Sequence, residues 1–185
     1  MKNIYLLFSS LKKIIFESDS CVIYKLKNRK ELGRIDPEVK VYSEFRDVPQ
    51  FIVKKLFDFP IINSLFYRIK SHKAKLLCIY DANTLIAYGW IQNWKPFKQK
   101  FGWLTKNGTM LGPYWTHPQY RGKGYYGRLL KHSIAVSNED LPLVIYTSPE
   151  NMNSQKGIEK IEFEKIGNFR IDFYFRHWVQ YKKIK

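Results

Sequence analysis

Cysteine is scarce in this sequence, and long apolar runs are missing. Only Cys21 and Cys78 occur among 185 residues, both in apolar, strand-like surroundings, and no CxxC pair is present. This argues against a disulfide framework and a zinc site, so we predict two buried thiols, no metal and a reducing, cytoplasmic compartment. No stretch reaches the roughly 18 apolar residues that a transmembrane helix needs.

Acidic residues are also few. There are 16 Asp and Glu against 32 Lys and Arg, which gives a net charge of +16. A field of that sign attracts nucleic acid, anionic lipid surfaces or phosphorylated small molecules. The lysines are scattered along the chain, so the charge permits several partners and selects none. No RNP, KH or helix-turn-helix signature is present, so nothing indicates a dedicated nucleic-acid domain.

Internal repeats and low-complexity linkers are absent as well. We therefore predict one domain over residues 21–185, preceded by an amphipathic segment at residues 1–20. A secretory signal is not expected there, because the apolar stretch is short and no small-residue cleavage site follows. The apolar stripe of residues 1–16 either contacts the inner membrane surface or packs on the domain or on a second copy in an oligomer. The stripe comprises Ile4, Leu7, Phe8, Leu11, Ile14 and Ile15.

Hydrophobic periodicity sets out the remaining elements. Strands are predicted at 21–26, 76–80, 84–92, 109–116, 141–146, 163–166 and 170–178, and helices at 48–56, 61–69, 126–136 and 151–160. We predict a mobile loop at 94–106, a strand break at Gly112-Pro113 and a hairpin turn at Gly167-Asn168. The order indicates an α/β fold, with a mixed, mostly antiparallel central sheet, one parallel β-α-β crossover and flanking helices.

The chemistry of the sequence is concentrated in a glycine-rich basic loop between a strand and a helix. Glycines let a backbone approach a ligand closely, and the first N–H groups of a helix point outward at the positive end of its dipole. Cations in the loop suit phosphate groups. The pattern fits neither a Walker loop nor a dinucleotide fingerprint. The glycines are Gly122, Gly124 and Gly127, and the cations are Arg121, Lys123 and Arg128.

Residues 116–130, Thr-His-Pro-Gln-Tyr-Arg-Gly-Lys-Gly-Tyr-Tyr-Gly-Arg-Leu-Leu, resemble the acyl-CoA signature of the GNAT superfamily of N-acetyltransferases. Asn151-x-x-Ser154 and residues 158–163 are similar to that family's second segment. The resemblance implies acetyl-CoA as the cofactor, with its pantetheine arm along Tyr114, Trp115 and Thr116. It also implies that Asn151 and Ser154 contact the pantetheine or adenine side. The residues implied to hold the pyrophosphate are Arg121, Gly122, Lys123, Gly124, Tyr125, Tyr126 and Gly127.

Three positions depart from the family pattern. Tyr126 and Glu162 stand where the family has glycine, and Ile158 replaces a tyrosine that often protonates the leaving thiolate. A proton donor must then come from elsewhere. We predict Tyr146, expected to point into the same cleft, as the acid and His117 as the base. A core aromatic and a turn residue are the structural alternatives for these two positions.

The sequence leaves the acceptor open. The tyrosine-rich loop resembles acetyltransferases of surface-polysaccharide pathways, which implies a small-molecule amine, an amino sugar that is nucleotide-linked or polysaccharide-bound. A second hypothesis is a protein or ribosomal N-acetyltransferase, which the positive charge would bring to RNA-rich particles. A third is a non-catalytic module that binds acyl-CoA or nucleic acid. The helical spacing places His132 mid-helix, and we expect it at the surface.

Overall fold

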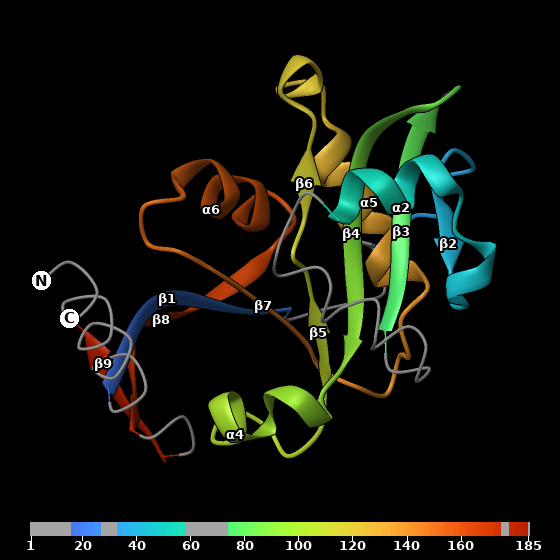
Figure 1. The fold of residues 1–185 in the computed structure, drawn as a ribbon. Helices are drawn as coiled ribbons and strands as arrows, with labels where there is room; N and C mark the ends of the chain where they lie inside the picture. The colour runs from blue at the N-terminus through green and yellow to red at the C-terminus, as the bar shows by residue number, and fades with distance from the viewer. Residues whose placement is uncertain (1–15, 27–32, 58–73, 175–177, 185) are drawn as a thin grey trace, which may run out of the picture.

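The computed structural model describes residues 16–26, 33–57, 74–174 and 178–184 (Figure 1). The predicted helix at 61–69 and most of the predicted amphipathic segment lie outside the described residues. None of the helices within the described part is both long and apolar enough to cross a bilayer.

A single sheet connects the described strands. Its order is β2-β3-β4-β5-β7-β1-β8-β9, with β6 beside β4. Among the described pairings, β5 with β7 is parallel and the others are antiparallel. This confirms the predicted mixed sheet with one parallel crossover. The strands are β1 Phe16–Leu26, β2 Lys40–Tyr42, β3 Ala74–Asp81, β4 Thr84–Asn93, β5 Thr109–Leu111, β6 Trp115–Thr116, β7 Leu143–Thr147, β8 Phe163–Tyr174 and β9 Trp178–Ile184.

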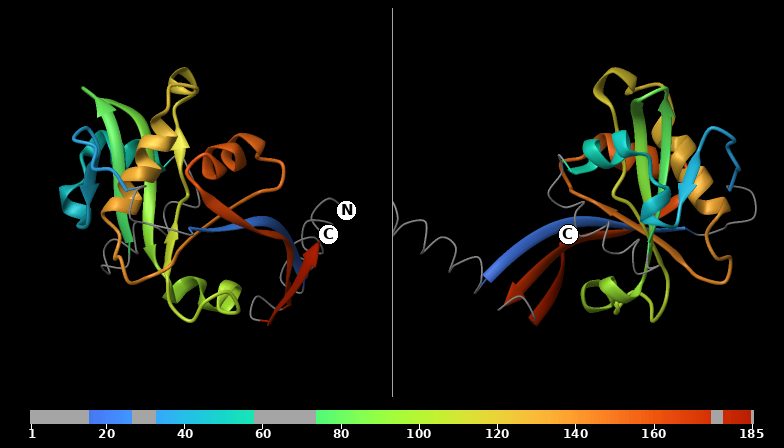
Figure 2. Two further views of the ribbon diagram at one scale, coloured as in Figure 1. Left: turned by 180° about the vertical axis from the view of Figure 1, so that it is seen from behind. Right: turned by 45° about the vertical axis from the view of Figure 1, so that its right-hand side comes forward.

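Helices cover both faces of this sheet. Figure 1 shows α2 in front of β3 and β4, and Figure 2 shows α5 on the opposite side. Apolar residues of α5 and α6 pack in one cluster with Leu111 and Ile145, whereas α2 and α4 pack against other clusters. The helices are α2 Gln50–Phe57, α4 Lys98–Phe101, α5 Tyr125–Ala135 and α6 Met152–Glu159, with short 3₁₀ turns η1 Phe45–Asp47, η2 Lys95–Phe97 and η3 Pro118–Tyr120.

Two predicted elements were wrong. The expected mobile loop at 94–106 contains η2 and α4, because the apolar side chains of Trp94 and Phe101 are buried under the sheet. The expected turn at Gly167-Asn168 lies inside the continuous strand β8. Gly167 pairs with Ile23 and Lys165 with Tyr24, so the register shifts there and the glycine marks a β-bulge. β8 instead pairs antiparallel with β9.

Glu162 follows α6 in a conformation that suits glycine. Its φ is 60°, and a left-handed backbone disfavours an L side chain by roughly 1–2 kcal/mol. Glycine removes this conformational cost. Its greater freedom in the unfolded chain, however, lowers the free energy of unfolding by about 0.5–1 kcal/mol. We therefore expect Glu162→Gly to raise the free energy of unfolding by about 0.5–1 kcal/mol in urea titrations. Glu162→Ala, which keeps the strain, is the control, and a glycine variant no more stable than wild type would contradict the expectation.

Candidate active site

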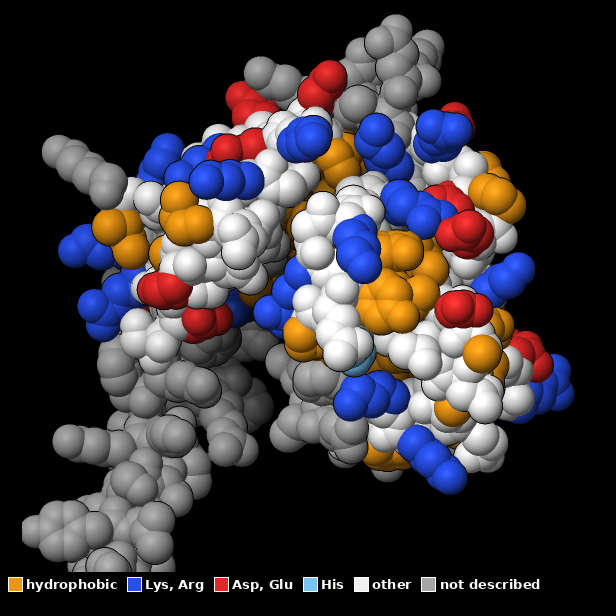
Figure 3. All heavy atoms as spheres, turned by 90° about the horizontal axis from the view of Figure 1, so that it is seen from above, with side chains coloured by type: hydrophobic (Ala, Val, Ile, Leu, Met, Phe, Trp, Pro, Cys, Tyr) orange, Lys and Arg blue, Asp and Glu red, His pale blue; other side chains and the backbone are white. Residues whose placement is uncertain are grey.

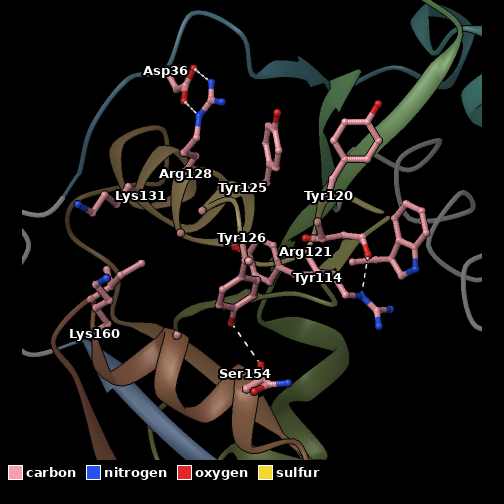
Figure 4. A pocket seen from close by; sticks show the side chains of 18 of the residues that line it. Asp36, Tyr114, Tyr120, Arg121, Tyr125, Tyr126, Arg128, Lys131, Ser154 and Lys160 are labelled. Atoms are coloured by element: carbon pink, nitrogen blue, oxygen red, sulfur yellow. Dashed lines mark hydrogen bonds and ion pairs between the residues drawn. The ribbon is translucent and has the colours of Figure 1, made fainter. Parts of the chain in front are cut away.

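A large groove lies between α5, α6 and the segment at residues 33–39. Its volume is about 1270 Å³, above the roughly 300–1,000 Å³ of most small-molecule sites. Figure 4 shows side chains from these elements converging on it. A groove of this size suits a long ligand.

The sheet opens beside β6, whose Trp115 and Thr116 line this groove. β5 and β7 pair from Thr109–Leu143 to Leu111–Ile145. Gly112 then turns the chain at φ 103°, and β6 pairs with β4 instead of β7. The two strands therefore part beyond Ile145 and leave an opening between β6 and the end of β7. The predicted strand break at Gly112-Pro113 is confirmed, and it moves the chain from its pairing with β7 to the side of β4.

The glycine-rich loop leads directly into the N-terminus of α5. Gly122 and Gly124 have φ of 77° and 83°, and a Cβ at either position would meet nothing within 4 Å. These glycines are therefore required for their backbone conformation and leave the space above them open. Helical hydrogen bonding starts where the Arg128 N–H donates to the Gly124 carbonyl at 3.1 Å. The amides before it form the positive end of the helix dipole, which favours an anion.

The groove brings together most of the predicted cofactor residues. Lys123 is not among the residues that line it, and its Nζ lies 5.2 Å from the centroid of the Tyr120 ring. The predicted residues that do line the groove are Tyr114, Trp115, Thr116, Arg121, Gly122, Gly124, Tyr125, Tyr126, Gly127, Asn151 and Ser154.

Arg128 lines the groove, but two acidic side chains already pair with its guanidinium, so its role as a cation for phosphate stays a prediction. Its Nε and Nη2 donate to the Asp36 carboxylate at 2.6 and 2.9 Å, and Nη2 also donates to Glu38 at 2.5 Å. The paired guanidinium holds the pKa of the Asp36 carboxyl below its ordinary value. Arg128 thus fastens the segment at residues 33–39 to α5.

That segment supplies the part of the groove that the sequence did not predict. Arg34, Asp36 and Glu38 line the groove, together with Lys131 on α5 and Lys160 after α6. The Arg34 N–H donates to the Lys131 carbonyl at 3.2 Å. The segment and α5 are nearly a hundred residues apart in sequence, so no local pattern indicates this contact. In the sequence, the Asp36-Pro37 pair indicates a turn but not the contact with α5.

His132 also anchors this segment. It is 4% exposed, contrary to the expected surface position, and its Nδ1 accepts the Asp36 N–H at 3.0 Å. Burial lowers the pKa of the imidazole from 6.5. The neutral form is therefore favoured in the folded state, and its stabilising effect is fully present above about pH 6.5 and lost as pH falls through the lower folded-state pKa.

We expect His132→Gln to reduce the loss of thermal stability between pH 7 and pH 5, because the amide oxygen can accept the same N–H without gaining a proton. Melting temperatures measured at each pH in both proteins test this. The same substitution at the half-buried His117 is the control. An unchanged pH profile for His132→Gln would contradict the prediction.

The two predicted catalytic side chains lie outside the groove. Tyr146 faces the opposite side of the sheet, since side chains alternate along β7 and Ile145 faces α5 and α6. Its ring lies 5.1 Å from the Phe101 ring, with the Lys100 Nζ 5.1 Å from its centroid. The prediction that Tyr146 points into the same cleft as the loop is wrong. It nevertheless immediately follows Ile145, where the strands part.

His117 lies at the start of η3. Its Nδ1 accepts the Gln119 N–H at 3.3 Å, and its ring meets Trp115 and Tyr120 edge to face. This arrangement fits the turn-residue alternative. A role as base stays a prediction.

Tyr126 occupies the centre of the groove. Its hydroxyl lies 3.4 Å from the Ser154 Oγ on α6, and burial raises its pKa to about 12. Ile158, one turn further along α6, is fully buried in the core. The position where the family often has a tyrosine therefore carries no proton donor.

Comparison with known proteins agrees with this geometry. The model of the acetyltransferase (GNAT) family matches residues 40–163. Among curated proteins, no relative matches. A putative GNAT acetyltransferase from Novosphingobium aromaticivorans superposes with a TM-score of 0.61 at 12% identity, covering 91% of this chain and 66% of its own. A GNAT acetyltransferase from Colwellia psychrerythraea gives 0.58 at 17% identity, covering 92% and 62%.

A GCN5-related N-acetyltransferase from Sphaerobacter thermophilus gives a TM-score of 0.55 at 5% identity, covering 92% of this chain and 56% of its own. The chain thus spans less than two thirds of the length of these structures. At such identities the likeness is one of fold. Since the family model covers more than half of the 185 residues, the chain belongs to the GNAT family of acetyltransferases.

Proposed function

We propose that the protein transfers an acetyl group from acetyl-CoA to the amine of an amino sugar. The observation that carries this proposal is the alignment of two features along one groove. The N-terminus of α5, with its left-handed glycines, suits a pyrophosphate. β6 lines the groove where β6 and β7 part, and its strand edge suits an amide-bearing arm.

In this reaction the amine nitrogen attacks the thioester carbonyl, the carbon–sulfur bond breaks, and the thiolate takes a proton. A backbone N–H near Trp115 or Thr116 would stabilise the developing oxyanion. We assign Tyr146 as the proton donor, because it stands at the opening on the face away from the groove. His117 is the proposed base, acting through water, since it does not line the groove.

The face around Tyr146 supports a sugar as the acceptor. Tyr146 and Trp103 are 36% and 44% exposed, and their rings pack against Phe101 and Phe169. Exposed aromatic faces beside a few polar groups are typical of small-molecule sites. The Lys100 Nζ lies 5.1 Å from the centroid of the Tyr146 ring and donates to the Asp19 carboxylate at 2.8 Å, so this face also carries charged groups.

The net charge of +16 favours a second candidate, a protein or ribosomal amine. Figure 3 shows Lys and Arg side chains spread over the face drawn, mixed with acidic and apolar ones. Such dispersion fits a solvated basic surface as well as it fits an RNA-rich partner. Binding to RNA should weaken steeply with salt, whereas acetylation of a sugar should change little.

The test is release of free CoA thiol from acetyl-CoA with three acceptors: glucosamine, a nucleotide-linked amino sugar and a lysine peptide. Turnover with an amino sugar, and a far lower rate with the peptide, is the expected result. If only the lysine peptide is acetylated, the acceptor is a protein amine and the proposed sugar acceptor is wrong. Hydrolysis without acceptor dependence would overturn both.

A further inference from the structure

Tyr126 joins the two helices that border the groove. Figure 4 shows its side chain pointing from α5 toward α6, with Lys131 and Lys160 on one side and Arg121 on the other. Its hydroxyl lies 3.4 Å from the Ser154 Oγ. Its ring meets the Tyr114 ring edge to face, with centroids 5.4 Å apart and planes at 82°.

Gly157 on α6 makes room for this ring. A Cβ at position 157 would lie 2.8 Å from Cε1 and 2.9 Å from Cδ1 of Tyr126, closer than real side chains approach. A large side chain on α5 is therefore matched by the smallest residue on α6. The ring fills the space between the helices.

The ring also stands on the route through the groove. Residues of α5 and α6 pack with Leu111 and Ile145, so both helices cover the opening of the strands from the side of the loop. An arm that runs from the N-terminus of α5 to the opening must pass between the two helices. Tyr126 lines this part of the groove and bridges the two helices through its contact with Ser154.

We propose that Tyr126 is a specificity-determining residue for the donor: its ring separates the phosphate end of the groove from the strand opening. A donor reaches the opening only if its arm displaces the ring from Ser154. This inference rests on the proposed acyl-CoA site. The displaced ring gives up one edge-to-face contact and one hydrogen bond, each a modest interaction, so binding can supply the required free energy.

Calorimetric titration with CoA and with ADP tests the proposal, since ADP carries the pyrophosphate without the arm. We expect Tyr126→Ala to bind CoA roughly tenfold more tightly, and ADP within about twofold of wild type. Tyr126→Phe keeps the ring and the packing but loses the hydrogen bond, so about threefold tighter CoA binding is expected. Tyr80→Ala, which removes a ring that packs against Phe51 outside the groove, is the control and should not tighten CoA binding.

Several outcomes would overturn the proposal. Weaker CoA binding by Tyr126→Ala would mean that the ring is a contact surface for the ligand. An equal gain in affinity for CoA and for ADP would mean that the Tyr126 ring acts at the phosphate end of the groove. If wild type binds CoA and no Tyr126 variant differs, the separating ring is refuted while the donor site stands. If neither wild type nor any variant binds CoA, the proposed donor fails and the inference with it.

Discussion

Gly124→Asp is expected to weaken CoA binding by about a hundredfold. The substitution places a carboxylate at the N-terminus of α5, where the proposed pyrophosphate binds. Two negative charges a few ångströms apart near a protein surface repel each other by several kcal/mol at most. It also puts a side chain on a residue with φ of 83°. Calorimetry with CoA measures the change.

Gly124→Asn separates these two effects. Asparagine has nearly the shape of aspartate and tolerates the left-handed conformation, but it carries no charge. Since a Cβ at this position meets nothing within 4 Å, the asparagine variant should lose far less affinity than the aspartate variant. Equal affinities for Gly124→Asp and wild type, in folded proteins, would show that the loop is only a structural turn.

Tyr146→Phe is expected to lower kcat by at least roughly tenfold, because positioned proton transfer contributes about 10²–10⁴-fold and a thiolate is a fairly good leaving group. The variant keeps the ring against Phe101 and beneath Lys100, so the packing of this face should persist. Acetyl-CoA affinity should be unchanged, since Tyr146 faces away from the groove. Steady-state rates and calorimetry together measure both quantities.

Tyr120→Phe is the matched control, because it also removes a tyrosine hydroxyl but lies in η3, after β6. If Tyr146→Phe retains full kcat, Tyr146 is a packing residue and solvent or the substrate supplies the proton. A large loss of acetyl-CoA affinity in the same variant would instead show that the Tyr146 side chain maintains the shape of the groove from the opposite face of the sheet.

The parts of the fold that follow local patterns were predictable. The Asp81-Ala82-Asn83 turn has Ala82 at φ 46° between paired strands, as the turn residues indicate. The loop, the start of α5 and the break at Gly112-Pro113 likewise depend on glycine and proline conformations that act within a few residues. The crossover follows from the order of elements.

The errors, and the ion pairs that the sequence did not indicate, came from contacts between distant segments. Burial of Trp94 and Phe101 orders a basic and aromatic segment that we predicted to be a mobile loop. The Arg128 ion pairs depend on Asp36 and Glu38, and charge alone cannot distinguish a paired guanidinium from one that awaits phosphate. The direction of Tyr146 depended on the phase of a short strand, where a shift of one residue exchanges the two faces.

Tyr126, which stands where the family has glycine, has a structural role that the sequence alone does not indicate. The sequence alone indicates only that a large residue replaces glycine. The structure adds that its ring reaches α6 and that Gly157 accommodates it. One substitution on α5 and a glycine on α6 thus form a single feature of the groove.

The most direct test of the acyl-CoA site is the melting temperature of the protein with and without acetyl-CoA. A ligand that binds only the folded state, at about a hundred times its Kd, adds about 2.7 kcal/mol of stability. For a chain of this size that corresponds to a rise of roughly 5–10 °C. The account predicts such a rise in wild type and little or none in Gly124→Asp. A folded wild-type sample whose melting temperature does not move at millimolar acetyl-CoA would contradict it.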